Sequence, residues 1–127
     1  MKSCPFCDVA VERIVAEDGP CVALRDKYPV SRGHILIVPR RHVASFREMT
    51  PDEWAAVHRL TKSLSAAMQA EDASVQGFNL GINDGRPAGQ TVLHAHVHLI
   101  PRRSGDVRQP EGGVRGVIPG KAAYPGQ

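Results

Sequence analysis

The chain has 127 residues, a length that forms one domain with a buried core and no need of disulfide bonds. Its composition of 42% apolar and 23% charged residues is that of a soluble globular protein. It shows no membrane span and no secretory signal, so we expect a cytoplasmic protein without a membrane partner. The net charge of +3 comes from dispersed basic residues and only 5% of residues are aromatic, which argues against nucleic acid and favours a small phosphorylated ligand.

Five strands and one long helix are predicted along the chain. Short apolar runs bounded by turn residues predict strands at residues 12–17, 21–26, 33–39, 76–83 and 91–100. Thr50 and Glu53 form a capping box around Pro51, which starts a helix that continues to about Glu71. Residues that recur along it at helical spacing form one apolar stripe, which we expect to be buried against the sheet (Trp54, Val57, Leu60, Thr61, Leu64, Ala67 and Met68). One helix is too few for a doubly wound sheet, so this order predicts an α+β fold with an antiparallel sheet.

Three histidines occupy alternate positions in the last predicted strand, His94, His96 and His98. Successive side chains of a strand point to opposite faces, so the three imidazoles share one face and the apolar residues between them share the other. Neutral imidazole is nucleophilic, basic and metal-binding near pH 7. This segment therefore offers both a core face and a reactive face.

Two chemistries use histidines at this spacing. In one, the imidazoles are ligands of a catalytic metal that keeps a position for water. In the other, one imidazole attacks phosphorus and forms a transient phosphoramidate, while its neighbours orient it and bind phosphate oxygens. The strand has no acidic residue, and the loop before it carries neutral donors and glycines (Asn83, Gly85, Gly89, Gln90 and Thr91). Converging N–H groups suit an anionic oxygen better than a dication, which favours phosphoryl chemistry.

The string GINDGRPAGQTVLHAHVHLIPR resembles the signature of the histidine triad (HIT) superfamily of nucleotide hydrolases and transferases. The resemblance extends back to RDKYPVSRGHILIVPRRHV and forward to PRRSGDV, over roughly residues 4–107. It implies a HIT-like α+β fold, with a five-stranded antiparallel sheet, one long helix and a short N-terminal helix. Residues 1–107 would then form a single domain. The Gly- and Pro-rich residues 108–127 would form a tail that is either flexible or lies across a partner or the site.

By this resemblance His96 is the nucleophile that takes the α-phosphoryl group of a nucleotide, and water then hydrolyses the nucleotidyl-histidine. His98 would hydrogen-bond a phosphate oxygen, and His34 would support the triad from the neighbouring strand. Four residues match substrate-contacting positions of the family: Asp26 for the ribose, and Asn83, Gln90 and Thr91 for the phosphate. Apolar side chains near the first strands are candidates for the base pocket (Phe6, Val22, Leu24 and Ile37).

Cys4 and Cys7 have the spacing of half a zinc site, although a redox pair has the same spacing. HIT proteins with this N-terminal pair place zinc between it, a histidine after the Gly-His strand and the first triad histidine. The resemblance therefore implies His42 and His94 as the other two ligands. A closed Cys2His2 site would be structural, and it would hold the N-terminal arm against the histidine strand.

The third triad position favours a hydrolase, because family branches that pass the nucleotide to a second substrate tend to have glutamine where this chain has His98. The string around the triad is most similar to the fragile histidine triad type, which cleaves dinucleoside polyphosphates. A purine nucleotide or dinucleotide is therefore the expected substrate, and the family resemblance also implies a homodimer. Three alternatives stay open: a nucleoside phosphoramidase acting on AMP–amine conjugates, a nucleotide-binding signalling protein with slow turnover, and a metal-dependent hydrolase.

Overall fold

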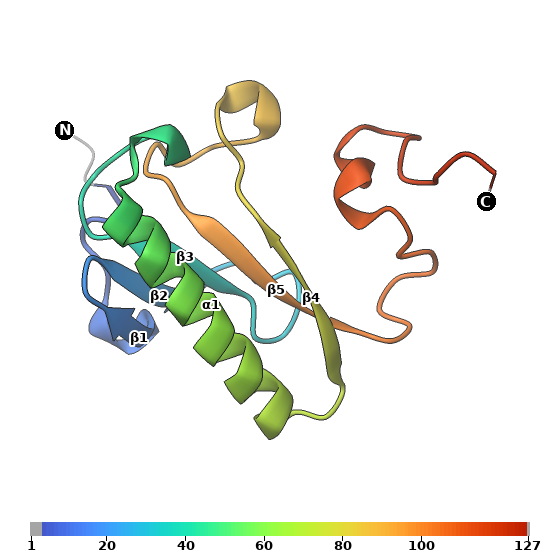
Figure 1. Cartoon of the computed structure of the whole chain (residues 1–127), viewed down its shortest axis with the longest axis horizontal. Coiled ribbons are helices and arrows are strands. Elements are labelled where there is room, and N and C mark those ends of the chain that lie inside the picture. Colours follow the sequence, from blue (N-terminus) through green and yellow to red (C-terminus); the bar gives the residue numbers. More distant parts are fainter. Residues whose placement is uncertain (1–3, 127) are drawn as a thin grey trace.

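A computed structural model describes residues 4–126 and shows one sheet with a long helix packed against it (Figure 1). The helix is α1 (Pro51–Glu71), and the strands are β1 (Ile14–Asp18), β2 (Cys21–Arg25), β3 (Ile35–Pro39), β4 (Val75–Gly81) and β5 (Val97–Arg103). All neighbouring strands are antiparallel, in the order β1-β2-β3-β5-β4. The predicted HIT-like α+β fold is confirmed, except that the short N-terminal helix is only a 3-10 turn at Val11–Arg13.

Side-chain caps start α1 at the predicted residue. The Thr50 hydroxyl accepts a hydrogen bond from the Glu53 N–H (3.1 Å), and the Glu53 carboxylate accepts one from the Thr50 N–H (2.8 Å). Trp54 was expected on the buried stripe but is 37% exposed. Glu53 is buried instead, because Arg41 binds its carboxylate at 3.0 Å. Among residues 4–126, no helix combines the length and the apolar character that a membrane span requires.

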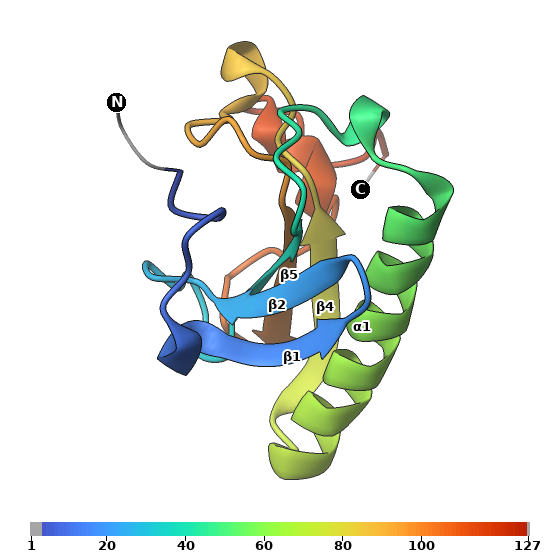
Figure 2. The same cartoon turned by 90° about the vertical axis from the view of Figure 1, so that its left-hand side faces the viewer.

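The sheet separates two apolar clusters. The buried cluster on the α1 side contains side chains from three strands and the helix, including Ala23, Ile37, Val97, Val57 and Leu60. The N-terminal segment covers the other side, as Figure 2 shows, and its cluster consists of Phe6, Val22, Leu24, Leu36 and Val38. Ile37 was expected in the base pocket together with Phe6, Val22 and Leu24. That expectation was wrong for Ile37, because side chains alternate along β3 and Ile37 points toward α1.

The histidine strand begins and ends later than predicted. β3 pairs with β5 only as far as Ile37 opposite Val97. Pro39 has no N–H to continue such a ladder, and residues 94–96 lie outside the sheet, with His94 in a bend. At its other end β5 continues through Pro101, which is tolerated because this part of the strand pairs with β4 alone.

The C-terminal tail passes beside β4 (orange to red in Figure 1). It contains a 3-10 turn at Gly113–Val117, and a Cβ at Gly113 would lie only 3.4 Å from the Asn79 amide nitrogen. Within the tail, the Arg115 guanidinium lies over the Tyr124 ring at 4.5 Å. The tail therefore contacts the domain next to the face that carries the histidines.

Candidate functional site

The three triad histidines keep the alternation of a strand although only His98 lies in β5. The residues between and after them point into the core on the α1 side (Ala95, Val97 and Leu99). The imidazoles therefore lie on the opposite side of the sheet, which we call the histidine face. On it, His94 is 0% and His96 is 8% exposed, and His98 is half-buried. The predicted alternation is confirmed: the apolar residues share the core face and the imidazoles share the other face.

Backbone geometry fixes which nitrogen of His96 is free. Its Nδ1 lies 2.8 Å from the carbonyl oxygen of His94. A carbonyl oxygen can only accept, so Nδ1 carries the proton and Nε2 keeps its lone pair. The ring is held laterally by Phe6, whose centroid lies 4.9 Å away in an edge-on contact. Nε2 of His96 is thus the nucleophilic atom of the histidine face.

A chain of hydrogen bonds places the proton of His98 on Nε2, whereas the proton of His96 is on Nδ1. The Val30 N–H donates to His34 Nδ1 at 3.1 Å, so the proton of neutral His34 is on Nε2. His34 Nε2 lies 2.9 Å from His98 Nδ1 and donates to it. His98 Nδ1 is therefore an acceptor, and its remaining proton sits on Nε2. His98 offers an N–H donor where His96 offers a lone pair.

Burial keeps these rings neutral. It lowers the pKa of His34 below its ordinary value, and the nearby Asp26 carboxylate opposes this shift only in part. Burial also lowers the pKa of His98, and the neighbouring rings of His96 and His34 lower it further. Neutral rings at pH 7 agree with the assignment of one donor and one acceptor nitrogen to each imidazole.

Asp26, His34 and His98 form a group that looks at first like a metal site. Their donor atoms lie within 4.8 Å of one another, and the Asp26 carboxylate is 3.3 Å from His34 Nε2. A metal would need the lone pair of that nitrogen, but the Val30 N–H bond keeps a proton there. We call this group the proton chain, because its geometry holds protons in place of an ion.

A second group lies where the N-terminal segment meets the histidine face, and we call it the metal cluster. Its donors, from Cys4, Cys7, His42 and His94, all lie within 4.8 Å of one another. His94 Nδ1 is 3.4 Å from the Cys4 sulfur and 3.5 Å from the Cys7 sulfur, and His42 Nδ1 is 3.1 Å from the Cys7 sulfur. Zinc bond lengths around a tetrahedral centre imply about 3.5 Å between sulfur and nitrogen ligands. The donor set and its spacing fit a zinc ion.

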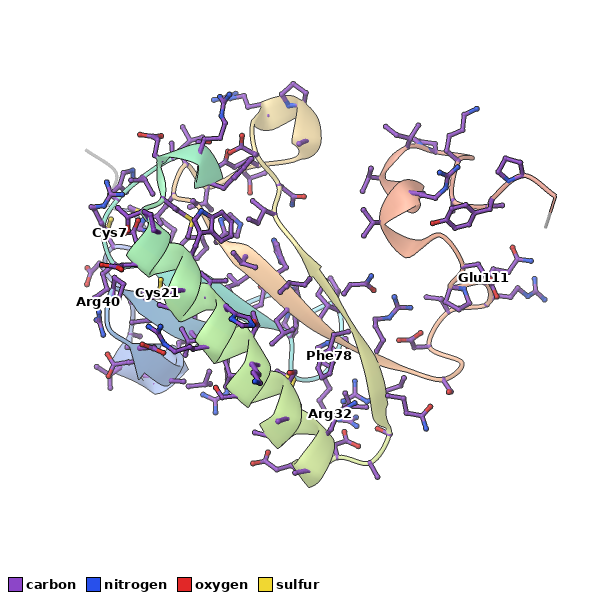
Figure 3. The ribbon with its side chains drawn as sticks, in the orientation of Figure 1. Cys7, Cys21, Arg32, Arg40, Phe78 and Glu111 are labelled. Atoms are coloured by element: carbon purple, nitrogen blue, oxygen red, sulfur yellow. The ribbon has the colours of Figure 1, made fainter. Side chains whose placement is uncertain are left out.

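The proton of His94 is placed as metal binding requires. Its Nε2 lies 2.7 Å from the Pro39 carbonyl oxygen and donates to it, which leaves Nδ1 unprotonated toward the two thiols. Burial lowers the pKa of His94, so the ring is neutral. Burial and the neighbouring Cys4 thiol raise the pKa of Cys7, and a bound dication would reverse this by taking the thiolate. Cys21, labelled with Cys7 in Figure 3, is fully buried and bonds the Glu53 carbonyl instead.

A cleft of about 670 Å³ opens beside His34 and His98 on the β4 side. Strand, loop and tail residues line it, among them Asn79, Asn83, Ile100, Val107, Val114 and Val117. Arg102 is the only Lys or Arg among its lining residues, and two hydrogen bonds of 2.8 Å join it to Asp106. Arg102 also bonds Asn79, and its guanidinium holds the pKa of Asp106 well below the usual range. The cleft therefore has no unpaired cation among the described residues that line it.

The loop before the histidines contains two exposed polar side chains and one buried side chain that hydrogen-bonds the loop backbone. Asn83 and Thr91 are exposed, and Asn83 lines the cleft. The Gln90 amide nitrogen donates to the Ala44 carbonyl at 2.8 Å and to the Val92 carbonyl at 3.1 Å, and the amide oxygen accepts from the Gly85 N–H at 2.9 Å. The structure thus brings Asn83 to the cleft and places Gln90 beneath the loop.

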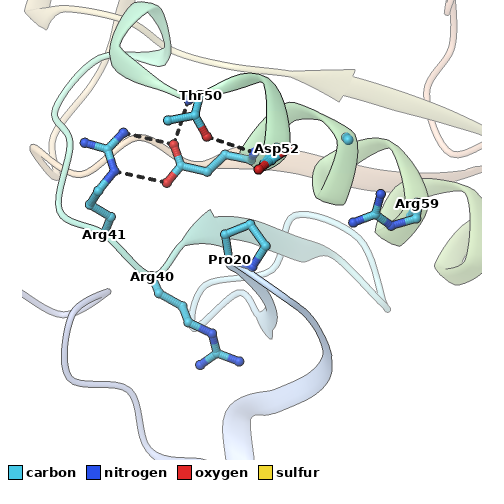
Figure 4. Close-up of a pocket in the computed structure, with 8 residues that line it drawn as sticks. Pro20, Arg40, Arg41, Thr50, Asp52 and Arg59 are labelled. Carbon is cyan, nitrogen blue, oxygen red and sulfur yellow. Dashed lines mark hydrogen bonds and ion pairs between the residues drawn. The ribbon is translucent and has the colours of Figure 1, made fainter.

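Another pocket lies by the first turn of α1 and is shown in Figure 4. Three arginines line it, and each is paired with a carboxylate: Arg40 with Glu17, Arg41 with Glu53, and Arg59 with Asp18. None of the histidines lines it. The histidine face is therefore the better candidate for chemistry.

Sequence reasoning missed the backbone groups that place the protons. The Val30 N–H, the Pro39 carbonyl and the His94 carbonyl have no signature in side-chain identity. It also missed Arg102 and Asp106 in the cleft, although opposite charges four residues apart were a usable signal. The triad nitrogens turn to different partners, so they do not converge on one ion. This geometry argues against the metal-dependent hydrolase.

The structure is thus an antiparallel α+β domain that carries three alternating histidines on its histidine face. Residues 8–105 match the family model described as the HIT domain, and the chain belongs to the HIT family. This family consists of nucleotide-binding hydrolases and transferases.

Three comparisons illustrate the relationship. Adenylylsulfatase HINT3 of Arabidopsis thaliana is 38% identical over 90 residues, which are 71% of this chain and 45% of that protein. A zinc-bound histidine triad family protein from Mycobacterium smegmatis superposes with a TM-score of 0.73 and 32% identity, covering 86% of this chain and 84% of that chain. Plasmodium falciparum diadenosine triphosphate hydrolase, in complex with cyclomarin A, gives a TM-score of 0.72 and 25% identity over 80% of this chain and 68% of that chain.

Proposed function

We propose that the protein hydrolyses nucleotides at the α-phosphate through a nucleotidyl-His96 intermediate. The observation that carries this proposal is the bond of 2.8 Å between His96 Nδ1 and the His94 carbonyl, which leaves Nε2 unprotonated. A neutral imidazole with its proton fixed on the far nitrogen is a competent nucleophile toward phosphorus.

The reaction would have two steps. His96 Nε2 forms a bond to the α-phosphorus while the bond to the leaving group breaks and the leaving group takes the electron pair. Water then attacks the same phosphorus, the N–P bond breaks, a proton is released and His96 regains its lone pair. The His98 Nε2–H would donate to a non-bridging phosphate oxygen, where charge accumulates during both steps.

Substrate contacts would come from the rest of the histidine face. The Asp26 side chain is 14% exposed and would accept hydrogen bonds from the ribose hydroxyls while its other contacts stay in place. Asn83 and Thr91 would donate hydrogen bonds to phosphate oxygens. Gln90 would keep the loop that carries them in place through its bonds to the Gly85 N–H and the Ala44 carbonyl. The apolar cluster around Phe6 would face the base.

Dinucleoside polyphosphates are the first substrate class in this proposal. The similarity to Plasmodium falciparum diadenosine triphosphate hydrolase and the string around the triad support it. The paired state of Arg102 favours a second candidate, because a polyphosphate leaving group would find no free cation in the cleft. A nucleoside phosphoramidase, which releases an amine, needs none. HINT3, described as an adenylylsulfatase, is a further relative whose name points to an adenylyl substrate.

The metal cluster would hold one structural zinc ion through Cys4, Cys7, His42 and His94. Zinc supplies a rigid four-ligand link between distant parts of a chain. Here the link would tie the N-terminal segment to the residue two before the nucleophile. His94 would thereby fix the backbone carbonyl that sets the proton of His96.

A cytoplasmic homodimer completes the proposal. None of the three cysteines forms a disulfide, which is compatible with a reducing compartment. β4 is an edge strand in the described sheet, and Leu80 on it is 51% exposed, so this edge would be available to a second copy. Sedimentation equilibrium would detect the dimer, and a monomer at micromolar concentration would refute it.

Trapping of the intermediate tests the proposed function. Purified protein is incubated with diadenosine tri- and tetraphosphate, AMP-lysine and AMP-NH2, quenched in base, and examined by intact-protein mass spectrometry. We expect an adenylyl adduct on His96 and hydrolysis of at least one substrate. His96→Ala should lose the adduct and about 10⁴-fold or more of kcat while keeping nucleotide affinity.

The matched control is His58→Ala, which removes an exposed histidine on α1 and should change neither. Full turnover by His96→Ala would overturn the mechanism. Nucleotide binding without turnover in the wild type would support the signalling protein instead.

A further inference from the structure

The N-terminal segment is attached to the domain almost entirely by side chains. The backbone hydrogen bonds described for residues 4–9 are local, from the Cys7 and Asp8 N–H groups to the Cys4 carbonyl at 3.2 Å. The segment reaches the sheet through the apolar side chains of Phe6 and Val9 and through the metal cluster. Its position therefore depends on two kinds of contact that lie within a few residues of each other.

Phe6 takes part in the apolar contact and also lies next to the metal cluster. In sequence it lies between Cys4 and Cys7, and its N–H donates to the Cys4 sulfur at 3.4 Å. In space its ring is 5.9 Å from the ring of His94 and 4.9 Å from the ring of His96, edge-on to both. The side chain is 8% exposed. One residue thus touches a metal ligand through its backbone and the nucleophile through its ring.

Without the metal, the remaining attachment of the segment is weak. The entropy cost of ordering six residues exceeds the gain from burying two apolar side chains. A cation held by the two cysteines and two histidines would supply what is missing, because it joins the segment directly to His42 and His94. Whatever holds the cysteines consequently holds the Phe6 ring against His96.

We propose that Phe6 is a positioning residue that couples the metal cluster to the nucleotide site. The inference rests on the proposed function, since it concerns the same histidine face. Metal binding fixes the Phe6 ring, and the ring fixes both the imidazole of His96 and one wall of the base pocket. Binding energies linked in this way are reciprocal, so a bound nucleotide must tighten the metal by the factor by which the metal tightens the nucleotide.

The release of zinc measures this coupling without any turnover. Zinc-loaded full-length protein is mixed with excess 4-(2-pyridylazo)resorcinol, and the colour of the zinc complex is followed with and without saturating AMP. We expect AMP to slow release by about 5- to 20-fold, and AMP affinity to fall by a similar factor in zinc-stripped protein. Calorimetric titration supplies the AMP affinities.

Phe6→Ala keeps all four metal ligands and should abolish the effect, so that AMP changes the release rate less than twofold. Phe6→Leu keeps an apolar side chain of similar volume without a ring, and the same loss there excludes a folding defect as the cause. Val11→Ala is the matched control, because Val11 lies just after the segment, is 78% exposed and belongs to neither apolar cluster. It should retain the full effect of AMP.

Equal slowing of zinc release in wild type and Phe6→Ala would overturn the proposal. AMP binding to the wild type with no change in zinc release would overturn it as well, while leaving the proposed function intact. No AMP binding at millimolar concentration would contradict the proposed function itself.

Discussion

Two groups on the histidine face contain nearly the same ingredients and do different things. The metal cluster and the proton chain each bring histidines and potential anions within 4.8 Å. In the metal cluster the backbone takes the proton-bearing nitrogen of His94, through the Pro39 carbonyl. In the proton chain a backbone N–H takes the lone pair of His34. The comparison teaches that the partner of the far ring nitrogen decides between metal binding and hydrogen bonding.

His96 lies between the two groups, and each group supplies one residue that acts on it. The carbonyl that orients its ring belongs to His94, a member of the metal cluster. The donor expected to assist it belongs to His98, the end of the proton chain. Each group can therefore be disturbed separately, and the effects on metal content, rate and stability should differ.

The largest expected effect is on zinc content. The wild type should bind one equivalent of zinc, because the metal cluster brings together four ligands with available lone pairs, whereas the proton chain keeps a proton on His34 Nε2. Cys7→Ser should weaken zinc binding by about 10²-fold or more, as measured by competition with a chelator and by elemental analysis. Cys21→Ser is the control and should keep one equivalent, since Cys21 lies outside the cluster. A second equivalent that disappears in Asp26→Ala would show that the proton chain binds metal after all.

His34→Ala should lower kcat by about 10- to 100-fold, because His98 loses the bond that fixes its proton on Nε2. Zinc content should stay at one equivalent, in contrast with Cys7→Ser. The measurement pairs steady-state kinetics with ¹⁵N spectra of the histidine rings, which report the tautomer directly. An unchanged His98 tautomer in the variant would refute the proton chain.

Arg103→Ala should destabilise the loop that carries Val30. The Arg103 guanidinium donates to the Ser31 hydroxyl at 2.9 Å, to the Arg32 carbonyl at 3.0 Å and to the Asp72 carboxylate at 3.0 Å. Losing these bonds should lower the free energy of unfolding by about 1–3 kcal/mol in urea denaturation. Arg47→Ala, an exposed control, should change it by less than about 0.5 kcal/mol. Equal stability of the two variants would contradict this role.

Acid should produce the smallest effect, which is best measured in Cys7→Ser so that metal loss does not contribute. Burial lowers the pKa of His34 and of His98 below about 6.5, the value in an unfolded chain. As the pH falls below about 6.5 the unfolded chain binds protons first, so the free energy of unfolding decreases. Urea midpoints between about pH 7.5 and pH 5.5 should show the decrease, and adding His34→Ala should flatten it. An identical slope with and without His34 would refute this source of acid sensitivity.

Local signals made much of the fold predictable from the sequence. The capping box of Thr50 and Glu53 marks the start of α1, and the strands follow from short apolar runs. The bounds of β5 could not be read in this way, because they depend on where β3 stops pairing with it. Trp54 fits the helical period but stays exposed, whereas its neighbour Glu53 is buried with its carboxylate bound by Arg41 and by the Thr50 N–H.

The residue types of the candidate site could be predicted from the sequence. Which ring nitrogen of each histidine carries the proton could not. The family resemblance brought together the four members of the metal cluster, and the structure places them side by side. The roles of individual ring nitrogens depend on backbone groups of Val30, Pro39 and His94, which any residue at those positions would provide. Such roles require three-dimensional coordinates.

The two sides of the sheet are covered unequally, and this difference has a consequence for how each side opens to solvent. The α1 side buries a cluster of twelve residues under a helix of 21 residues, whereas the cluster on the histidine face has five buried members under a short segment. Amide hydrogen exchange on the two sides should therefore proceed by different routes, with local opening at residues 4–9 and only global unfolding beneath α1. The domain can expose its reactive side to solvent many times for each time that its core unfolds.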